Sequence, residues 1–499
     1  MLSRRRFLSL VGATAGAATA SGLLAACSGP TNVPGPVNAS SSRVLERERL
    51  RQAAGQATVT AEIAAQTGAV DLGGPTVHSW TYGGNVPGPE IRLRAGDMLR
   101  ANLRNDLPQP TTIHWHGIAL RNDMDGVPVL TQAAVASGAA FRYEFTVPDP
   151  GTYIFHPHVG TQLDRGLYGA LIVDDPNERG DYDQELVVLF DDWLDGTARD
   201  PDQVLADLKA NGMSGMQGME GMGGMHMQRS DLLGGDAGDV SYPYYLANGR
   251  ISAAAQTFLA KAGQRVRLRL INIAGDTAFR IGVPGVPLTI THTDGFPVHP
   301  TAGPSVLLGM GERMDAIITL PDDSRPLVGI AEGKGGAARV ALNVGRPTAV
   351  TVDAAAADIS AQPVIRAEEL VATDRVSLPD RAPDVVHDLK LGGPGEGYSW
   401  TINDQPYDPA HGLSVSEGQR VRLRLVNTTS MFHPMHLHGH TFQVRTASGL
   451  GARKDTVNVL PGRAVEVEFD ADNPGQWLTH CHNVYHGEAG MMTVVSYSS

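Results

Sequence analysis

The chain has 499 residues and a formal net charge of −13 at pH 7. This length agrees with about three domains of ordinary size, and the excess of acidic over basic side chains argues against nucleic acid as a partner. The same charge favours solubility or the attraction of cations, but it identifies no substrate.

The first residues have the pattern of an export signal. Ser3-Arg4-Arg5-Arg6-Phe7-Leu8 is a twin-arginine motif, and an apolar run rich in alanine and glycine follows it up to Leu24-Ala25-Ala26-Cys27. Because the run is short and ends in small residues, it predicts a cleaved signal rather than a retained membrane helix. No later segment is apolar and long enough to be expected to span a bilayer.

Cys27 lies where the signal of a bacterial lipoprotein has the cysteine that receives a lipid. We therefore expect export by the twin-arginine route and a lipid anchor at Cys27, which would hold the protein at the membrane outside the cytoplasm, in the cell envelope or periplasm. A plain signal cut nearby is the competing interpretation. The residues after Cys27 are rich in Ser, Pro, Asn and Gly, so residues 1–46 are expected to be signal and flexible tether.

Two His-x-His pairs follow, His114-Trp115-His116 and His156-Pro157-His158. Alternate side chains of an extended strand share a face, so each pair predicts two imidazoles that point the same way. Asp125 lies nine residues after His116 and precedes Gly126, and Asp-Gly is a strong turn signal.

A stretch of apolar residues alternating with arginine occurs three times. Residues 263–272 are nearly repeated at 418–427, and a weaker copy begins at Gly96 and ends at Asn105. The alternation predicts half-buried strands. Starts that lie about 155 to 167 residues apart indicate three similar modules.

Six methionines punctuate a glycine-rich run at residues 211–228: Met213, Met216, Met219, Met222, Met225 and Met227. Thioethers favour Cu(I), so the run is a candidate for transient Cu(I) capture. A three-residue spacing also suits an amphipathic helix, but the glycines disfavour a stable helix, which leaves a flexible tract without a ligand as the competitor.

The third module begins after residues 346–388, which are rich in Ala, Asp and Pro and are expected to link it to the second. Within it, the segment 433–440 reads His-Pro-Met-His-Leu-His-Gly-His. His436 and His438 form a third pair on one strand face.

The last motif is His480-Cys481-His482, which supplies the fourth pair. Its two histidines share one strand face while Cys481 points to the other, so two metal centres could meet across one strand. Cys481, with His486 and Met491 downstream, supplies the thiolate, imidazole and axial thioether of a blue copper site.

The second imidazole of such a site must come from elsewhere, and His433 is the candidate. Met491 could also be a core residue, but its position ten residues after Cys481 favours an axial ligand. Four His-x-His pairs provide eight further imidazoles, too many for one mononuclear site, and therefore imply a metal cluster. Similar spacings within the two halves, about 42 residues from His114 to His156 and about 44 from His436 to His480, indicate a duplication.

These motifs resemble those of the three-domain multicopper oxidases, the family of laccases and bacterial copper-resistance oxidases, over nearly the whole chain after the leader. The resemblance implies an all-β fold of three cupredoxin-like Greek-key β-sandwich domains, with a copper cluster between the first and third. We expect the domains at residues 47–178, 179–345 and 389–499, with the Met-rich insert 211–228 in the second and the linker 346–388 before the third.

The resemblance also implies four copper ions, one type 1, one type 2 and two type 3. The type 1 ligands would be His433, Cys481, His486 and Met491. The type 2 pair would be His114 and His436. One type 3 ion would be bound by His116, His156 and His482, and the other by His158, His438 and His480.

The activity implied is one-electron oxidation of Cu(I), with Fe(II) and phenols as further donors, coupled to four-electron reduction of O2 to water, in protection against copper. Electrons would pass from the type 1 ion through Cys481 to the cluster. Two alternatives remain: a laccase that acts mainly on phenolic or other organic donors, and a copper-sequestering lipoprotein without turnover. A copper nitrite reductase would leave half of the histidines without a role.

Three further assignments follow from the resemblance. Asp125 matches the family's acid near the type 2 ion and is a candidate for proton transfer, with a plain turn aspartate as an equal alternative. The acid usually found after the last type 1 histidine is replaced by Gly487, and Glu488 comes one residue later. Met431 matches a position that binds substrate copper in copper-oxidising relatives, whereas Thr429 replaces an acid of that site.

The stretch Arg453-Lys454-Asp455-Thr456-Val457 resembles a family segment near the copper sites, although an ordinary loop-to-strand junction explains it equally well. Cys27 and Cys481 are the only cysteines. With one in the leader and the other on copper, no disulfide is expected.

Overall fold

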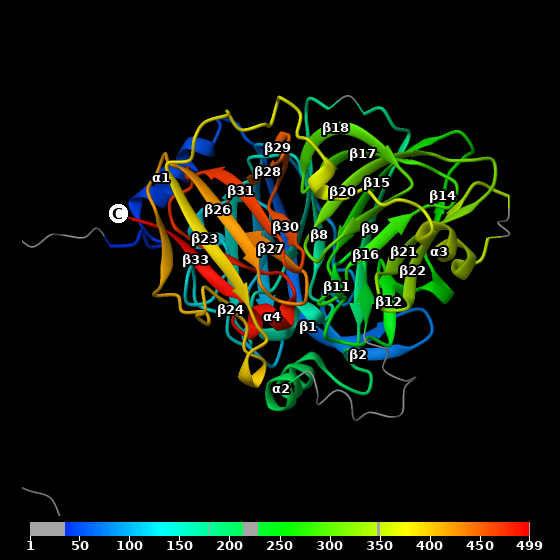
Figure 1. Ribbon diagram of the computed structural model, residues 1–499, viewed down its shortest axis with the longest axis horizontal. Helices are drawn as coiled ribbons and strands as arrows, with labels where there is room; N and C mark the ends of the chain where they lie inside the picture. Colours follow the sequence, from blue (N-terminus) through cyan, green and yellow to red (C-terminus); the bar gives the residue numbers. More distant parts are fainter. Residues whose placement is uncertain (1–34, 179, 213–227, 347–349, 499) are drawn as a thin grey trace, which may run out of the picture. The chain divides into compact units, whose positions relative to one another are not determined.

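The computed structural model describes residues 35–178, 180–212, 228–346 and 350–498. The chain separates into two units, residues 1–35 and residues 36–499, and all the elements named below belong to the second (Figure 1). Cys27 and the six methionines of the Met-rich tract lie outside the described residues. Among the described residues, the search for a helix long and apolar enough to cross a membrane finds none.

The first pair of sheets lies between residues 58 and 174. One sheet has the strand order β2-β1-β4-β6 and the other β3-β8-β7-β5. The strands are β1 (Thr58–Asp71), β2 (Thr76–Tyr82), β3 (Ile91–Arg94), β4 (Met98–Asn105), β5 (His114–His116), β6 (Ala140–Thr146), β7 (Gly151–His156) and β8 (Gly169–Asp174).

The second pair has seven and five strands, in the orders β13-β12-β9-β15-β20-β17-β18 and β14-β22-β21-β16-β19. The strands are β9 (Gln184–Trp193), β12 (Tyr244–Ala247), β13 (Arg250–Ile251), β14 (Thr257–Leu259), β15 (Arg265–Asn272), β16 (Phe279–Gly282), β17 (Leu288–Thr293), β18 (Phe296–Gly303), β19 (Ser305–Leu308), β20 (Arg313–Thr319), β21 (Arg325–Ala331) and β22 (Gly336–Asn343). A short hairpin of β10 (Arg229–Ser230) and β11 (Gly235–Asp236) precedes β12.

The third pair has six and five strands, in the orders β24-β23-β26-β31-β28-β29 and β25-β33-β32-β27-β30. The strands are β23 (Val385–Gly392), β24 (Thr401–Ile402), β25 (Gly412–Val415), β26 (Arg420–Asn427), β27 (His433–Leu437), β28 (Phe442–Thr446), β29 (Gly449–Lys454), β30 (Thr456–Val459), β31 (Ala464–Asp470), β32 (Gln476–Cys481) and β33 (Met492–Tyr497). Three two-sheet sandwiches in succession confirm the predicted all-β class.

Short helices and 3-10 turns flank or interrupt the strands, and of the described ones only α3 and η5 lie between two sandwiches. The α-helices are α1 (Ser42–Arg51), α2 (Pro201–Asn211), α3 (Val352–Ser360) and α4 (Val484–Glu488), and the 3-10 turns are η1 (Asn122–Met124), η2 (Gly160–Asp164), η4 (Ser252–Ala254), η5 (Ala367–Glu369) and η6 (Glu396–Tyr398). The expected boundary between tether and first domain falls inside α1, and α3 and η5 lie in the expected linker; the domain limits stay predictions.

The threefold repeat seen in the sequence has one structural role. Each copy forms a strand, β4, β15 or β26, that pairs in parallel with an earlier strand (β1, β9 or β23) and antiparallel with a later one (β6, β20 or β31). The repeat therefore marks the same position in three similar sandwiches.

The expected half-burial is correct for β4 and β26 and wrong for β15, where every residue after Arg265 is buried. The guanidinium groups of Arg267 and Arg269 reach Asp315 at 2.6 and 3.2 Å, and Thr152 of the first sandwich donates a hydrogen bond to Asp315 and accepts one from Arg269. The outer face of β15 is buried because the first sandwich covers it.

The first and third sandwiches share one hydrophobic core, and the second sandwich has a core that is mostly its own. Buried apolar residues of the first and third sandwiches form one continuous cluster, whereas most of the second sandwich has its own. The interface between the first and third sandwiches is thus part of a core, and the motifs that carry the paired histidines border it.

Candidate metal centre

The four His-x-His pairs lie on two equivalent strand pairs, although His158, His438 and His482 stand one or two residues past the ends of their strands. β5 pairs antiparallel with β7, so that His114 lies opposite His156. β27 pairs antiparallel with β32, so that His436 lies opposite His480. The first and third sandwiches therefore present their histidines with the same pairing, as the duplicated spacing predicted.

Strand alternation separates these histidines from the core. Trp115, between two histidines of β5, is fully buried and makes edge contacts with Tyr143 and Phe145. Cys481 alternates in the same way with His480 and His482. One strand face thus packs the core while the other carries imidazoles.

The two sets of histidines interleave across the interface. The His114 ring stacks on that of His438, and the His116 ring stacks on that of His436, each with centroids 3.7 Å apart. All eight residues are linked by ring contacts: His114, His116, His156, His158, His436, His438, His480 and His482. Residues more than 300 positions apart in the sequence therefore form one group.

In most of these rings one nitrogen is anchored. Nδ1 of His114 donates to the Asp125 carbonyl at 2.9 Å, Nδ1 of His156 to the Pro157 carbonyl at 2.9 Å, and Nδ1 of His480 to the Cys481 carbonyl at 2.9 Å. These hydrogen bonds fix the tautomer of each ring and leave Nε2 as the nitrogen that is available to bind a metal ion.

The second nitrogens are buried and unsatisfied. Within the described residues, Nε2 has no hydrogen-bond partner in His114, His156 and His436. The same holds for Nδ1 of His116 and for both ring nitrogens of His482. Burial, with repulsion from neighbouring imidazoles, lowers the pKa of His480 to about 3 and also depresses that of His482, so both rings are neutral. Neutral imidazoles with inward-facing lone pairs fit a transition-metal cluster.

One Nε2 atom from each of the second, third and fourth pairs converges on one point. His480 Nε2 lies 3.4 Å from His158 Nε2 and 3.1 Å from His438 Nε2, and these three residues form one of the groups able to hold an ion. Other groups are His114 with His436 and His438, and His114 with His116 and His156. The first group is the set expected for one type 3 ion, whereas the others combine residues expected on different ions.

Cys481 faces a second, separate group. Its Sγ lies 3.6 Å from His433 Nδ1 and 3.7 Å from His486 Nδ1, and the two Nδ1 atoms are 3.1 Å apart. All three side chains are buried, and burial raises the pKa of the thiol, so the thiolate requires a neighbouring cation. Met491 is fully buried, and its backbone is hydrogen bonded to those of Cys481 and His486.

The outer nitrogens of these two histidines have different partners. His433 Nε2 lies 2.8 Å from Thr429 Oγ1, and His486 Nε2 donates to Asp239 Oδ2 at 3.0 Å. The Trp400 ring stacks on His486 with centroids 3.9 Å apart. Asp239 was missed by the sequence analysis, because an aspartate in a glycine-rich stretch gives no sign of a partner more than 200 residues away.

Asp125 is a turn residue that also contacts the histidine group. It ends the turn η1, and Gly126 follows at φ +81°, where an added Cβ would lie 2.0 Å from the Ile113 carbonyl oxygen. Its fully buried carboxylate also accepts a hydrogen bond at 2.9 Å from His438 Nδ1. The turn therefore places an acid behind the histidine group.

The segment 453–457 also reaches the histidine group. Asp455 Oδ1 accepts from His116 Nε2 at 3.0 Å, and the Asp455 carbonyl accepts from His436 Nδ1 at 2.9 Å. Although burial alone would raise the pKa of Asp455, Arg313 and His116 hold it well below its ordinary value. The segment is more than a loop-to-strand junction.

Two adjacent cavities approach the histidine group. A small space of about 30 Å³ is lined by His158 and His480, and a larger, more open one of about 520 Å³ lies beside it. His158, Gly487 and Glu488 line both, and burial, partly opposed by Lys209, raises the pKa of Glu488 to about 7. Met431, the residue expected to bind substrate copper, is buried.

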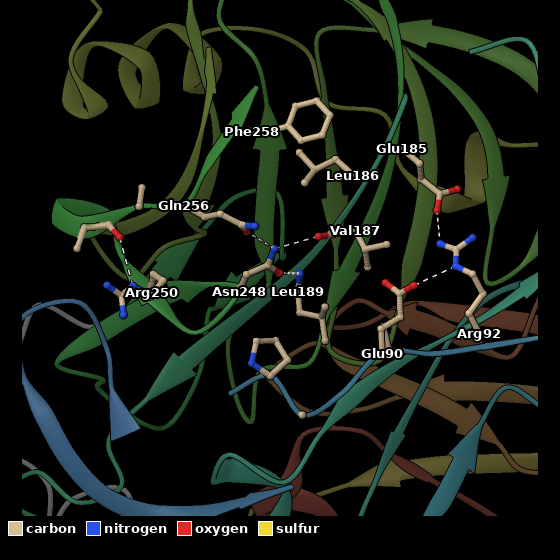
Figure 2. Close-up of a pocket in the computed structure, with 15 residues that line it drawn as sticks. Glu90, Arg92, Glu185, Leu186, Val187, Leu189, Asn248, Arg250, Gln256 and Phe258 are labelled. Atoms are coloured by element: carbon tan, nitrogen blue, oxygen red, sulfur yellow. Dashed lines mark hydrogen bonds and ion pairs between the residues drawn. The ribbon is translucent and has the colours of Figure 1, made fainter. Parts of the chain in front are cut away.

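A further open pocket of about 740 Å³ lies away from these groups, between the first and second sandwiches (Figure 2). Its polar side chains bind one another: Arg92 pairs with Glu90 and Glu185, and Asn248 donates to Gln256. This pocket contains none of the chemistry-bearing motifs.

Comparisons with known proteins agree with this geometry. Family models described as multicopper oxidase match residues 64–178, 184–348 and 380–499. The chain is 46% identical to the multicopper oxidase MmcO of Mycobacterium tuberculosis, with 99% of this chain and 96% of that protein covered. It is 28% identical to a copper resistance protein A homolog of Pseudomonas syringae pv. tomato, over 85% of this chain and 90% of that protein.

Solved structures share the fold. Fet3p, described as a multicopper oxidase that functions in iron import, has a TM-score of 0.74 at 20% identity, covering 88% of this chain and 90% of that one. A multi-copper oxidase from Pseudomonas thermotolerans has a TM-score of 0.67 at 27% identity, covering 89% of this chain and 100% of that one. The three sandwiches are cupredoxin-like domains, as the resemblance in sequence predicted.

Proposed function

Because the chain belongs to the multicopper oxidase family, we propose that it oxidises Cu(I), with Fe(II) and phenols as further donors, and reduces O2 to water in protection against copper. The observation that carries the proposal is the position of Cys481. It faces His433 and His486, while its neighbours along the strand, His480 and His482, point into the group of eight imidazoles.

We assign four copper ions to these groups. The type 1 ion would be held by His433, Cys481, His486 and Met491, and the type 2 ion by His114 and His436. The type 3 ions would be held by His116, His156 and His482, and by His158, His438 and His480. Support comes from the unsatisfied inward nitrogens and from the two groups that match the expected sets, His433-Cys481-His486 and His158-His438-His480.

When bound, the copper ions supply a one-electron acceptor and a site where O2 takes four electrons and four protons to give two water molecules. The protein's contribution is placement. The Cys481 backbone joins the two groups directly, because its flanking residues carry cluster imidazoles on the opposite strand face. Anchored outer nitrogens hold each ring at a fixed tautomer and orientation.

Asp125 is proposed to transfer protons to the cluster. Its carboxylate contacts His438 and its backbone carbonyl contacts His114, so it bridges ligands assigned to different ions. Glu488 lines the cavity beside His158 and His480, next to Gly487, which replaces the family's acid. A carboxyl group within reach of the reacting atoms is the usual proton carrier in such sites.

The donor is proposed to give its electron at the Asp239–His486 contact. Asp239 is 8% exposed, and its Oδ1 has no hydrogen-bond partner among the described residues. A β-bridge joins the backbone of Met431 to that of Asp236 in β11. It places a thioether residue next to a second carboxylate in the segment that contains Asp239. Carboxylates favour Fe(II) and thioethers favour Cu(I), in keeping with both metal donors.

Location remains a proposal from the sequence. We infer export by the twin-arginine route and a lipid anchor on Cys27, which lies outside the described residues. A Cys27→Ala variant should move from the membrane to the soluble extracytoplasmic fraction. A variant with lysine at both Arg4 and Arg5 should stay inside the cell. Membrane retention of C27A would contradict the anchor, and export of the second variant would contradict the route.

The activity is tested by O2 uptake of the copper-loaded protein with Cu(I), Fe(II) or a phenol as donor. The parent is compared with a variant in which all six methionines of residues 213–227 are serine, so that tract length is unchanged. We expect uptake of one O2 per four Cu(I) and a slower Cu(I) reaction in the variant, with phenol oxidation unaltered. Fastest turnover of the phenol, with no effect of the serines, would favour a laccase, and no uptake would favour copper storage.

A further inference from the structure

The second domain supplies none of the ligands proposed for the four copper ions, yet one of its side chains lies behind those ligands. Arg313, the first residue of β20, is fully buried. Its Nη1 and Nη2 donate to Oδ1 and Oδ2 of Asp455 in the third domain, both at 2.7 Å, and its Nε donates at 2.9 Å to the Thr152 carbonyl of the first domain. One guanidinium group thus joins all three domains.

Asp455 links Arg313 to two proposed copper ligands. Its Oδ1 accepts from His116 Nε2 at 3.0 Å, and its carbonyl accepts from His436 Nδ1 at 2.9 Å. Thr456 Oγ1 lies 3.2 Å from the first nitrogen and 3.1 Å from the second. The two rings stack 10° from parallel, so a rotation of either would disturb the other.

These contacts select which ring nitrogens face the cluster. His116 is anchored through Nε2, leaving Nδ1 buried and without a partner in the described part of the chain, whereas His436 is anchored through Nδ1, leaving Nε2 in that state. Asp455 anchors different nitrogens in the two rings: its side chain binds Nε2 of His116, and its backbone carbonyl binds Nδ1 of His436. A ligand's outer hydrogen bond decides which nitrogen binds metal.

Asp455 lies close enough to two proposed ligands to bind a metal ion with them. His116, His436 and Asp455 offer ligand atoms that lie within 4.8 Å of one another, close enough to hold an ion. The fork of Arg313 occupies both carboxylate oxygens in a bidentate pair, the strongest geometry for this contact. The guanidinium therefore competes with any metal ion for this carboxylate.

Two glycines leave room for this ion pair and for the neighbouring histidines. An added Cβ on Gly117 would lie 2.6 Å from both Arg313 Nη2 and Asp455 Oδ2, and one on Gly311 would lie 2.8 Å from His482 Cδ2. Both glycines have positive φ, +88° and +82°. Close approach of backbone to these groups is possible only without a side chain.

We propose that Arg313 is a positioning residue of the copper cluster: through Asp455 it fixes the metal-facing nitrogens of His116 and His436 and keeps that carboxylate from binding copper. The inference rests on the copper assignments proposed above. It makes the second domain part of the cluster site rather than a spacer between the two ligand-bearing domains.

The test uses Arg313→Gln, Arg313→Lys and the double variant Arg313→Gln/Asp455→Asn in the full-length, copper-loaded protein. The control is Arg267→Gln, which removes another buried guanidinium from an aspartate, Asp315, that contacts no proposed ligand. The readouts are copper per protein, the type 2 electron paramagnetic resonance signal and the type 1 blue absorption. Affinity for cluster copper is read from copper retained during titration with a chelator.

In R313Q, the freed carboxylate should bind copper and alter the type 2 signal, and cluster affinity should fall roughly 10- to 100-fold, with the blue absorption unchanged. R313K keeps the charge but loses the fork, so it should show the same change to a smaller extent. The double variant should regain most of the parent signal, because an amide is a poor copper ligand yet still accepts from His116. R267Q should lower thermal stability without changing either signal.

An unchanged type 2 signal in R313Q and R313K would overturn the proposal, as would equal losses in R267Q or a double variant no better than R313Q. If R313Q does not fold, the type 2 signals of R313K and of the double variant test the proposal in its place. A parent protein without cluster copper would instead contradict the copper assignments, so the two failures are distinguishable.

Discussion

Nε2 of His486 and Oδ2 of Asp239 lie 3.0 Å apart, which links the outer edge of the proposed type 1 site to a carboxylate of the second domain. Asp239 also accepts a hydrogen bond from the Tyr398 hydroxyl, and its backbone N–H donates to Asp276. The carboxylate is therefore held in place rather than free to turn away. A donor that reaches it is one imidazole away from the metal.

Replacing Asp239 with Asn should slow oxidation of the cationic donors Cu(I) and Fe(II) by roughly 10-fold, because a charge-assisted contact contributes about 1.5–3 kcal/mol. Oxidation of a neutral phenol should change less. The control is Asp231→Asn, which removes the same charge from an exposed position of the same segment. Steady-state O2 uptake with each donor measures the effect. Equal slowing of all donors would contradict a specific role in binding cations.

Replacing Cys481 with Ser should remove the blue absorption and one copper ion per protein. The Cys481 sulfur lies within 3.7 Å of Nδ1 of both His433 and His486, and a hydroxyl in its place is a poor copper ligand. The type 2 signal should persist, because the cluster imidazoles lie on the other strand face. Copper analysis and absorption spectra measure this. Loss of all copper would show that the two sites do not form independently.

Replacing Asp125 with Asn should lower turnover about 100-fold, within the usual range for a lost proton carrier. Reduction of the type 1 site by the donor should stay near its parent rate, because the histidines that Asp125 contacts, His438 and His114, are assigned to the cluster and not to the type 1 site. Asp123→Asn is the matched control, since Asp123 belongs to the same turn but pairs with Arg121. Stopped-flow bleaching of the blue absorption, compared with O2 uptake, separates the two steps. A slowed bleaching step in D125N would argue against proton transfer.

Removing copper with a chelator should lower the midpoint of thermal unfolding, and adding copper back should restore it. Binding to the folded state alone stabilises by RT ln(1 + [L]/Kd), about 4 kcal/mol at a thousandfold excess over Kd. Because the eight imidazoles come from two domains, much of this stabilisation should act on their interface. Differential scanning calorimetry of both forms measures it. An unchanged midpoint would mean that the domains close equally well without metal.

Asp315 gives a pH-dependent stability prediction. Burial would raise its pKa, but Arg267 and Arg269 outweigh burial and lower it from 3.8 to about 2. A carboxylate with a depressed folded-state pKa stabilises the fold above its ordinary value, and the stabilisation is lost as pH falls from about 4 to 2. Asp315→Asn should therefore destabilise the protein by about 3–5 kcal/mol at pH 7, and the difference from the parent should narrow below pH 4.

Urea unfolding at several pH values between 7 and 3 measures this difference. Asp323→Asn is the control, because Asp323 pairs with Arg325 at the surface and should contribute less than about 1 kcal/mol. A gap between D315N and the parent that stays constant down to pH 3 would contradict the depressed pKa.

The motifs with strict local spacing were predictable from the sequence. Alternation on a strand requires Cys481 to point away from His480 and His482, and the repeat ending at Asn105, Asn272 and Asn427 marks equivalent strands in all three domains. The burial of β15 was not predictable, because the residues that cover Arg267 and Arg269 come from another domain. Local pattern reports the period of a strand but not what packs on its outer face.

Asp239 and Arg313 show the same limit at the site. Each meets its partner across domains, His486 in one case and Asp455 in the other, and neither lies in a motif with the spacing of metal ligands. Asp125 is intermediate: its turn was evident from Asp-Gly, but its contact with His438 joins residues more than 300 positions apart.

By itself, the sequence determined the ligand chemistry: one thiolate, paired imidazoles at two-residue spacing and a duplicated arrangement, because these follow from covalent order and the period of a strand. The tertiary structure decided which nitrogen each imidazole presents, which carboxylates stand behind them and which domain supplies the guanidinium that restrains Asp455. Those choices depend on hydrogen bonds and ion pairs between segments hundreds of residues apart, and such contacts leave no mark on local spacing.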